Sequence, residues 1–271
     1  MVFSQPMIFL TIYIAVFGLV IGCFLNVCIY RIPTNHSIIN PPSHCTSCGT
    51  RLRPLDLVPV FSYVFLRGKC RYCGERVSAR YPIVECLTAA VFVLLYFRFS
   101  LTIEFLAATF FACILICVAF IDFDFKIIPN GLVIAGLVVG VALCVYNLFY
   151  PVSMYGDRVW YNPLLGIICG SGVLFLISIV GSLVYKTEDA MGMGDVKLFV
   201  VVGLFLGWRL TIIAFMVAVI FAAIISLALI LFKRLNKKST VPFGPFIALG
   251  AFIAMTYGWN IIDFYIGFLP K

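Results

Sequence analysis

Long apolar runs separated by short polar segments dominate this sequence. Each run is close to the roughly 17 to 25 residues that a helix needs to cross the hydrocarbon core of a bilayer. Hydrophobic residues make up 63% of the 271 residues and charged residues only 11%, whereas soluble globular domains have roughly 45–50% and 25%. We therefore expect an all-α polytopic membrane protein with about eight transmembrane helices.

The predicted spans are residues 7–29, 82–99, 103–121, 131–150, 163–185, 196–208, 211–232 and 243–268. The first run has no basic residue before it and is longer than the roughly 7–15-residue core of a secretory signal, so we interpret it as a retained helix. The sixth run is short, and its ends are poorly defined by the pattern. The expected organisation is a first transmembrane helix (1–29), a polar loop (30–81) and a seven-helix membrane domain (82–271).

The basic residues give the orientation of these spans. The formal net charge is +8, but the basic residues lie in short segments between spans, as the positive-inside rule produces, so we expect no nucleic-acid partner. If loop 30–81 is cytoplasmic, alternation places 15 of the 19 basic residues on that side and both termini outside. The four on the other side are Arg98, Arg158, Arg209 and Lys271. The cytoplasmic ones outside the loop are Lys126, Lys186, Lys197, Lys233, Arg234, Lys237 and Lys238.

Loop 30–81 contains two C-x-x-C pairs, and it is too short to hold a substantial core without a staple. The pairs are Cys45/Cys48 and Cys70/Cys73, and a glycine follows each second cysteine. This zinc-ribbon-like spacing predicts a closed four-cysteine zinc site that folds the loop. Disulfides are the alternative, but they do not persist in the reducing cytoplasm. His44 is a rival ligand in principle, although four cysteines already complete a tetrahedral set.

Carboxylates at the ends of two predicted spans are the strongest functional signal, because acids in a membrane are costly. Asp122 and Asp124 end the third span, and Asp195 begins the sixth within Gly192-Met193-Gly194-Asp195. The charge-derived topology places both sites on the cytoplasmic side. Two carboxylates that share a proton can supply the base that activates water and the acid that protonates a scissile amide. This is the chemistry of an aspartyl peptidase.

Gly192 and Gly194 are expected to support this site, because glycine permits close backbone approach and unusual dihedral angles beside Asp195. Two other interpretations stay open at this point. The acids could pair with Lys126 and Lys197 or line an ion path in a small transporter. The cysteine loop taken alone would suit an adaptor for assembling a secretion machine.

The motifs resemble those of the type IV prepilin peptidases, the bacterial branch of the G-x-G-D intramembrane aspartyl proteases, over nearly the whole chain. The matching segments are Gly22-Cys23-Phe24-Leu25-Asn26-Val27, Arg31-Ile32-Pro33, Pro41-Pro42-Ser43-His44-Cys45, Arg80-Tyr81-Pro82-Ile83-Val84-Glu85 and Pro242-Phe243-Gly244-Pro245-Phe246. The family pattern selects Asp122 rather than Asp124 as the partner of Asp195. If the third helix continues that far, these two acids point about 200° apart, so only one can face Asp195.

The resemblance implies a bifunctional enzyme in the bacterial inner membrane. It would remove the leader of type IV prepilins or of type II secretion pseudopilins at the cytoplasmic face, then N-methylate the new amino terminus with S-adenosylmethionine as methyl donor. No motif identifies the donor site: no G-x-G-x-x-G follows a strand. Glu85 is a possible member of that site, although a structural pairing with Arg80 is the simpler expectation. Nothing in the sequence points to an oligomeric state.

Overall fold

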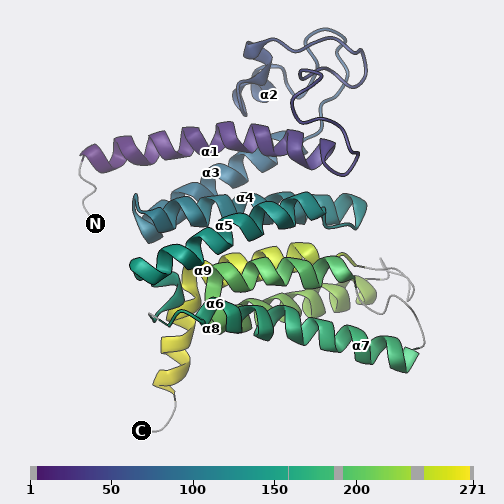
Figure 1. Cartoon of the computed structure of the whole chain (residues 1–271). Helices are drawn as coiled ribbons and strands as arrows, with labels where there is room; N and C mark the ends of the chain where they lie inside the picture. The colour runs from purple at the N-terminus through teal and green to yellow at the C-terminus, as the bar shows by residue number, and fades with distance from the viewer. Residues whose placement is uncertain (1–4, 158, 186–191, 233–240, 269–271) are drawn as a thin grey trace. The chain divides into compact units, whose positions relative to one another are not determined.

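The computed structural model describes residues 5–157, 159–185, 192–232 and 241–268 (Figure 1). Within these ranges the regular secondary structure is helical, and β-type pairing is limited to isolated bridges. Seven helices in the described ranges are long and apolar enough to cross a membrane. The prediction of an all-α, multi-span membrane protein is therefore confirmed.

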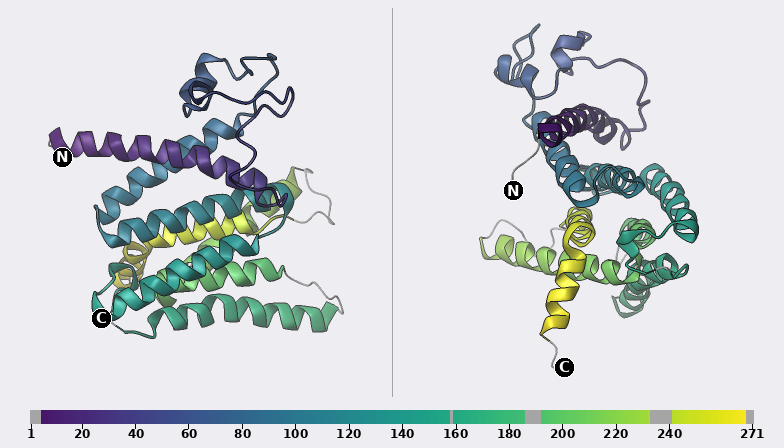
Figure 2. Two further views of the ribbon diagram at one scale, coloured as in Figure 1. Left: turned by 45° about the horizontal axis from the view of Figure 1, so that its top comes forward. Right: turned by 90° about the vertical axis from the view of Figure 1, so that its left-hand side faces the viewer.

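The helical elements follow the predicted spans closely. They are α1 (Gln5–Arg31), η1 (Pro54–Leu57), α2 (Phe61–Phe65), α3 (Arg80–Phe99), α4 (Ile103–Phe125), α5 (Asn130–Phe149), η2 (Ser153–Tyr155), α6 (Asn162–Ile167), η3 (Ile168–Gly172), α7 (Val173–Tyr185), α8 (Met193–Leu231) and α9 (Gly244–Gly267). One predicted span is divided among α6, the single π-helical turn η3 and α7, which continue as one rod (Figure 2).

The chain divides into two compact units, and the first comprises Met1–Phe105. Helices α1 and α3 cross in close contact within it (Figures 1 and 2). Small residues make this approach possible, because a Cβ at Gly18 would lie 2.7 Å from the Cα of Ala89 and one at Gly22 would lie 2.6 Å from the Cα of Glu85. Glycines spaced four apart commonly allow such backbone contact between membrane helices.

Buried polar side chains attach the four-cysteine loop to this helix pair. The Asn26 side-chain amide donates to the backbone oxygens of Gly22 and Tyr81, at 3.2 and 3.1 Å. The Arg31 guanidinium donates to the carbonyls of Ser37 and Pro41, at 2.8 and 2.6 Å. These bonds fix where the loop leaves α1 and where it enters α3.

The second unit comprises Leu106–Lys271, and its central feature is a reversal inside α8. Gly207 interrupts the helix with φ 69° and ψ 175°, a backbone conformation that side-chain-bearing residues rarely adopt. The rings of Phe199 and Phe215, eight residues to either side, lie 5.7 Å apart. The two parts of α8 therefore run back along each other (Figure 1). They correspond to the predicted sixth and seventh spans. Seven long helices therefore agree with eight predicted spans, because α8 contains two of them.

Polar contacts hold the reversal in place. The side-chain oxygen of Asn162 accepts a hydrogen bond from the Trp208 amide at 3.1 Å, and its amide donates to the Tyr155 carbonyl at 3.0 Å. The Tyr155 hydroxyl donates in turn to the carbonyl of Leu204 at 2.6 Å. A Cβ at Gly207 would overlap the Asn162 oxygen. Glycine is thus required at this position by its conformation and by its neighbour.

The first part of α8 lies at the centre of the second unit. Val201, Val202 and Phe205 are fully buried. The ring of Phe205 stacks on that of Phe111 from α4, with centroids 4.4 Å apart. Gly203 packs directly against the backbone of Gly166 in α6. The segment that carries Asp195 is therefore surrounded by other helices, whereas many apolar side chains on the outer helices are exposed, as expected for lipid-facing surfaces.

Several residues used for the topology prediction lie outside the described residues: Arg158, Lys186, Lys233, Arg234, Lys237, Lys238 and Lys271.

The loop between the first two predicted spans contains short helical turns, η1 and α2, rather than a regular fold.

Candidate active site

Asp122 lies one turn before the end of α4, since the helix continues to Phe125 rather than ending at the predicted residue 121. Asp122 is only 6% exposed, whereas Asp124 is exposed. Two positions along a helix correspond to about 200°, so the two carboxylates point to opposite sides. The structure therefore directs Asp122 into the protein and Asp124 away from it.

Gly244 holds the Asp122 carboxylate from the start of α9. Its backbone amide donates a hydrogen bond of 2.8 Å to Oδ2 of Asp122. The first amides of a helix have no acceptor inside the helix and complement negative charge. A Cβ at Gly244 would lie 2.7 Å from the same oxygen, so only glycine brings its amide this close. Sequence reasoning missed this role, and the sole available signal was the Pro242-Phe243-Gly244-Pro245 pattern.

Asp195 occupies the first turn of α8, within electrostatic range of Asp122. Gly192 is the N-cap residue of this helix, and the amide of Asp195 donates to the Gly192 carbonyl at 3.1 Å. Asp195 is partly buried, and Asp122 is near enough for the two carboxylates to repel each other. Helices α4, α8 and α9 thus bring two acids and one amide donor together from three distant parts of the chain.

Of the two glycines before Asp195, Gly194 is the one that space requires, whereas Gly192 borders an open flank. Gly192 has φ −61° and ψ 117°, an extended conformation open to any residue, so the expected dihedral role is wrong there. A Cβ at Gly194 would lie 3.1 Å from the Cβ of Ile128, and one at Gly192 would lie 3.4 Å from Oδ2 of Asp195. Both glycines leave room at the side of the aspartate pair.

Lys197 does not neutralise Asp195, as the anchoring interpretation would require. Its ammonium donates to the side-chain oxygen of Asn130 at 3.1 Å, linking α8 to the first turn of α5. Among the described residues, the charged group that acts on Asp195 is Asp122. Lys126, by contrast, acts electrostatically on Asp122, so the anchoring interpretation fails at Asp195 and not at Asp122.

The four cysteine sulfurs of the first unit converge on one point. The Sγ atoms of Cys45, Cys48, Cys70 and Cys73 all lie within 4.8 Å of one another, and those of Cys45 and Cys73 are 3.9 Å apart. Tetrahedral zinc with Zn–S bonds of about 2.3 Å requires sulfurs separated by roughly 3.8 Å. The cluster is therefore suited to a metal ion. The His44 ring is turned to the Pro42 carbonyl, 3.1 Å from Nδ1.

Two matching turns create this convergence. The amides of Gly49 and Gly74 donate to the carbonyls of Cys45 and Cys70, at 2.9 and 3.0 Å, and both glycines have a positive φ, 70° and 74°. The amide of Cys48, with that of Ser47, lowers the pKa of Cys45. The equivalent amides in the second turn, led by that of Cys73, lower the pKa of Cys70.

The last thiol of the cluster behaves differently. The amide of Glu75 acts to lower the pKa of Cys73, but desolvation and the three neighbouring thiols raise it to about 12. The neighbouring thiols therefore oppose loss of the proton from Cys73, the fourth cysteine of the cluster. A bound divalent cation would neutralise that charge and release the proton.

Asp56 attaches η1 to the second cysteine turn. It accepts hydrogen bonds from Arg71 Nε at 2.6 Å and from the Tyr72 hydroxyl at 2.9 Å, both in the second turn, and from the Arg53 amide at 3.0 Å. Its side chain is 4% exposed. This carboxylate thus has a structural role in shaping the loop.

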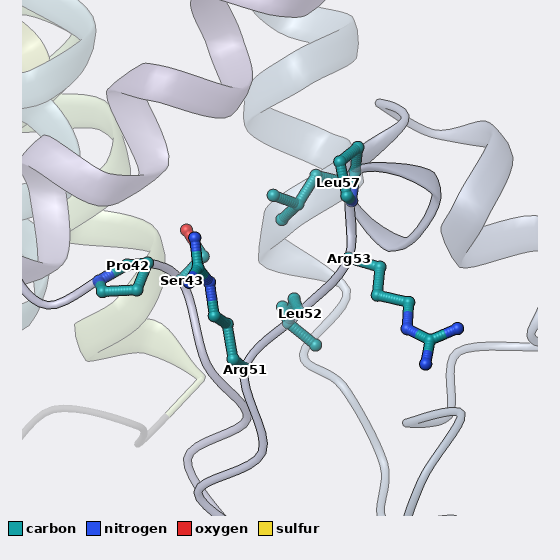
Figure 3. Close-up of a pocket in the computed structure, with 7 residues that line it drawn as sticks. Pro42, Ser43, Arg51, Leu52, Arg53 and Leu57 are labelled. Carbon is teal, nitrogen blue, oxygen red and sulfur yellow. The ribbon is translucent and has the colours of Figure 1, made fainter.

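A cavity of about 440 Å³ opens within the same loop (Figure 3). It is lined by Pro42, Ser43, Arg51, Leu52, Arg53, Pro54 and Leu57. No acidic side chain in this lining complements a sulfonium ion, and no aromatic ring offers a stacking face for adenine. The residues that line the cavity do not fit S-adenosylmethionine, so we do not assign the methyl-donor site to this cavity.

Glu85 lies in α3 beside Gly22 and is 6% exposed. Among the described residues, its carboxylate contacts the Val60 amide, which donates to Oε2 at 2.8 Å, and the Cys23 thiol. The expected pairing with Arg80 is wrong. Val60 of the loop lies beside α3, so its backbone amide occupies the position next to Glu85 that the Arg80 guanidinium was expected to fill.

Comparison with known proteins places this geometry in context. Residues 16–99 match the model of the bacterial peptidase A24 N-terminal domain, and residues 109–227 match that of the type IV leader peptidase family. A Bacillus subtilis protein named prepilin leader peptidase/N-methyltransferase is 39% identical over 93% of this chain and 96% of its own length. Proteins of the same name from Pseudomonas putida and Dichelobacter nodosus are each 30% identical. The alignments cover 95% of this chain in both cases, and 93% and 95% of the two relatives. No solved structure matches the chain.

Each of the two family models matches part of one compact unit, and the aspartate pair lies within the second match. The chain belongs to the type IV leader peptidase family.

Proposed function

We propose that this membrane protein is an aspartyl endopeptidase that removes the leader of type IV prepilins or type II secretion pseudopilins. The observation that carries the proposal is the pair Asp122 and Asp195, two acids from different helices that lie within electrostatic range of each other. The names of the relatives favour this function over a transporter or a secretion-assembly adaptor.

In the proposed reaction the two carboxylates share one proton. Asp122 accepts the Gly244 amide, a contact that complements negative charge, so we assign it the role of the base that removes a proton from the attacking water. Asp195 then donates its proton to the nitrogen of the scissile amide. The two carboxyl groups thus exchange protonation states in one turnover, and proton exchange with water restores the starting state of the pair.

Gly192 and Gly194 support this site by leaving space beside Asp195. A helical substrate has to be unwound before its peptide bond can be attacked, and an extended segment needs close backbone approach. We place the extended substrate segment at the open flank beside Gly192. The nearest neighbour of a Cβ added there is the Asp195 carboxylate.

The active site and the four-cysteine loop are assigned to the cytoplasmic side of the inner membrane, with both termini outside. This orientation rests on the excess of Arg and Lys in loop 30–81. The reversal at Gly207 supports it, because it returns the end of α8 to the face on which Asp195 lies.

Zinc is the metal we propose for the four cysteines. Four thiolates would complete the tetrahedral set of a zinc ion and leave no open coordination position for a substrate, so the ion would have a structural role. It would hold together two turns that lack a core of their own.

We further infer that the protein N-methylates the processed substrate, as the names of its relatives state for those proteins. S-adenosylmethionine would supply the methyl group.

Co-expression with a candidate prepilin from the same genome, in a host without its own prepilin peptidase, tests both activities. Mass spectrometry of the pilin should find the leader removed and one methyl group, about 14 Da, added at the new amino terminus. A pilin that keeps its leader would refute the peptidase. Full cleavage without the added methyl group would refute only the second activity.

A further inference from the structure

The short helix α2 of the four-cysteine loop turns its apolar side chains outwards. Phe61, Val64 and Phe65 are separated by three and four positions, so they lie on one face of the helix, which we call the α2 face. All three side chains are exposed, and Phe65 is 82% exposed. Ser62 and Tyr63, the polar residues of the same helix, are partly buried. A helix at the surface of a soluble domain has the opposite arrangement, so the α2 face indicates an apolar partner.

Apolar exposure continues into the turn before α2. Leu55 in η1 and Val58 directly after η1 are also exposed. The acid of this turn, Asp56, is directed instead to Arg71 and Tyr72. Segment 55–65 therefore presents apolar side chains and keeps its one acidic side chain inside the loop. Such clusters mark protein or membrane contacts, whereas single exposed apolar side chains need no explanation.

Contacts with α1 and α3 fix the depth of α2 relative to the membrane. Val60, the N-cap residue of α2, donates its amide to Glu85 of α3 at 2.8 Å. The Leu57 carbonyl lies 4.0 Å from the sulfur of Cys23 in α1. Cys23 precedes the end of α1 at Arg31 by eight residues, or about 12 Å of helix. The 27 residues of α1 extend about 40 Å, which is about 10 Å more than the hydrocarbon core. Even if all of this excess projected on the loop side, Cys23 would still lie within the hydrocarbon core.

The ribbon views agree with this placement. In Figure 1 and in the left view of Figure 2, α2 lies beside α1 rather than beyond its last turn. Near Cys23, α1 exposes Val20 and Phe24, as expected of a surface in contact with lipid. The α2 face is therefore at a depth at which α1 itself is surrounded by lipid.

Basic residues border segment 55–65 on both sides. Two precede it and two follow it, and all four are exposed: Arg51, Arg53, Arg67 and Lys69. An apolar face with such a border is typical of segments in the membrane interface, where apolar side chains reach the acyl chains and cations meet lipid phosphates. The border also favours lipid over a second copy of this chain, whose own loop would bring the same positive charge.

We propose that α2 is an interfacial membrane anchor. Its apolar face lies among the outer acyl carbons of the surrounding leaflet, and the four bordering cations contact the phosphates of anionic lipids. The four-cysteine loop is thereby held against the bilayer. This inference goes beyond the proposed peptidase activity and does not depend on it, because it uses only the loop and two helices of the first unit.

Photo-crosslinking of the full-length protein in nanodiscs tests the contact. The photoreactive amino acid p-benzoylphenylalanine replaces Phe65, which is exposed enough for the change to leave the fold intact. The discs contain phosphatidylethanolamine and phosphatidylglycerol. After irradiation, mass spectrometry of the peptide that contains position 65 should find the added mass of one phospholipid, with or without an added prepilin. An absence of lipid adducts, or crosslinks to a second copy of the chain or to the prepilin in their place, would overturn the proposal.

The matched control places the same photoreactive amino acid at Ile39. This side chain is 83% exposed, but it follows the end of α1 by eight residues. Position 65 should give at least about fivefold more lipid adduct than position 39, because only the α2 face lies at the depth of the acyl chains. Equal yields at the two positions would show that labelling reports exposure alone and would refute the anchor.

Phe61→Asp combined with Val64→Asp separates insertion from chance collision with lipid. Both side chains are exposed, so these changes leave the loop intact. Two carboxylates on the α2 face are costly among acyl chains, so lipid adducts at position 65 should fall at least about tenfold. A melting curve like that of the parent protein establishes that the variant is folded. Adducts at the original yield in the folded variant would sink the assignment.

Lipid composition tests the basic border. Replacing phosphatidylglycerol by zwitterionic phosphatidylcholine should lower the adduct yield at position 65 about two- to fivefold, because the cations lose their anionic partners. Arg67→Gln combined with Lys69→Gln should lower the yield in the original discs in the same way. An unchanged yield in both experiments would refute the contact between the basic border and lipid phosphates.

Discussion

The backbone amide of Gly244 donates a hydrogen bond of 2.8 Å to the carboxylate of Asp122, across 122 positions of sequence. A helix start is thereby directed at an acid buried at the end of another helix. The donor complements the negative charge that a general base must carry, and it fixes the rotamer of the side chain. Asp195 completes the site from a third helix. This arrangement leads to predictions for each of its members.

Asp122→Asn and Asp195→Asn should each abolish leader cleavage, lowering the rate by at least about 100-fold, because each removes a group that transfers a proton. Asp124→Asn should retain substantial activity, since Asp124 is exposed on the other side of α4. The measurement is leader removal from a prepilin in membranes. Cleavage that persists in Asp195→Asn would contradict the proposed mechanism.

Gly244→Ala should lower the cleavage rate about 10- to 100-fold. The added Cβ would lie 2.7 Å from Oδ2 of Asp122, so the amide and the carboxylate have to separate. Gly267→Ala in the same helix is the control, because no atom lies within 4 Å of the added Cβ. The turnover number, measured at saturating substrate, is the relevant quantity. Equal rates for the two variants would show that the Gly244 contact is dispensable.

Gly207→Ala should destabilise the protein by about 1–3 kcal/mol, because alanine is strained at a positive φ and its Cβ would overlap the Asn162 oxygen. Thermal melting in detergent would measure the change. Gly172→Ala, whose nearest contact would be an ordinary 3.7 Å, should melt like the wild type.

Reporter fusions would test the reversal itself. Fusions ending after Gly192 and after Phe232 should report the same side of the membrane, and a fusion after Trp208 the opposite side. A continuous helix from Met193 to Leu231 would instead put the first two on opposite sides, and that result would contradict the eight-crossing topology.

Changing Cys45 and Cys70 to serine should abolish stoichiometric zinc in the purified protein, measured by metal analysis. Cys86→Ser is the control, since Cys86 is an exposed cysteine of α3 outside the cluster. Full metal content in the double variant would rule out the four-cysteine site.

Zinc in the wild-type protein should be lost on acidification and retained at neutral pH. The backbone amides hold the pKa of Cys45 and of Cys70 below the usual thiol value, so these thiolates persist as the pH falls. Protons then compete with the metal for all four sulfurs. Metal content measured across a pH series would check this, and release on raising the pH would contradict it.

Span positions could be predicted from sequence because bilayer thickness sets a minimum length for each apolar run. The end of α4 was predicted at residue 121 because two acids lower the hydropathy there, yet the backbone hydrogen bonds continue to Phe125. That extension is what buries Asp122. Hydropathy reports the preference of side chains for lipid, and it carries no information about where a helix ends inside a protein.

Other features depend on contacts that no local pattern contains. The approach of Gly244 to Asp122 joins helices far apart in sequence, and the reversal at Gly207 depends on one backbone angle and on Asn162. The cysteine cluster could be predicted because each C-x-x-C turn is local and two such turns suffice for one tetrahedron. The contact between Glu85 and Val60 could not, since a backbone amide has no signature in the sequence.

The reversal at Gly207 has a consequence for biosynthesis. The part of α8 before Gly207 is about 20 Å long, shorter than the roughly 30 Å hydrocarbon core, so it enters the bilayer together with the part that follows it. Asp195 therefore reaches its place only after the whole hairpin has been synthesised, and Gly244 follows later still. The full set of contacts at Asp122 therefore exists only after α9 has been synthesised, because α9 supplies the amide that donates to this acid.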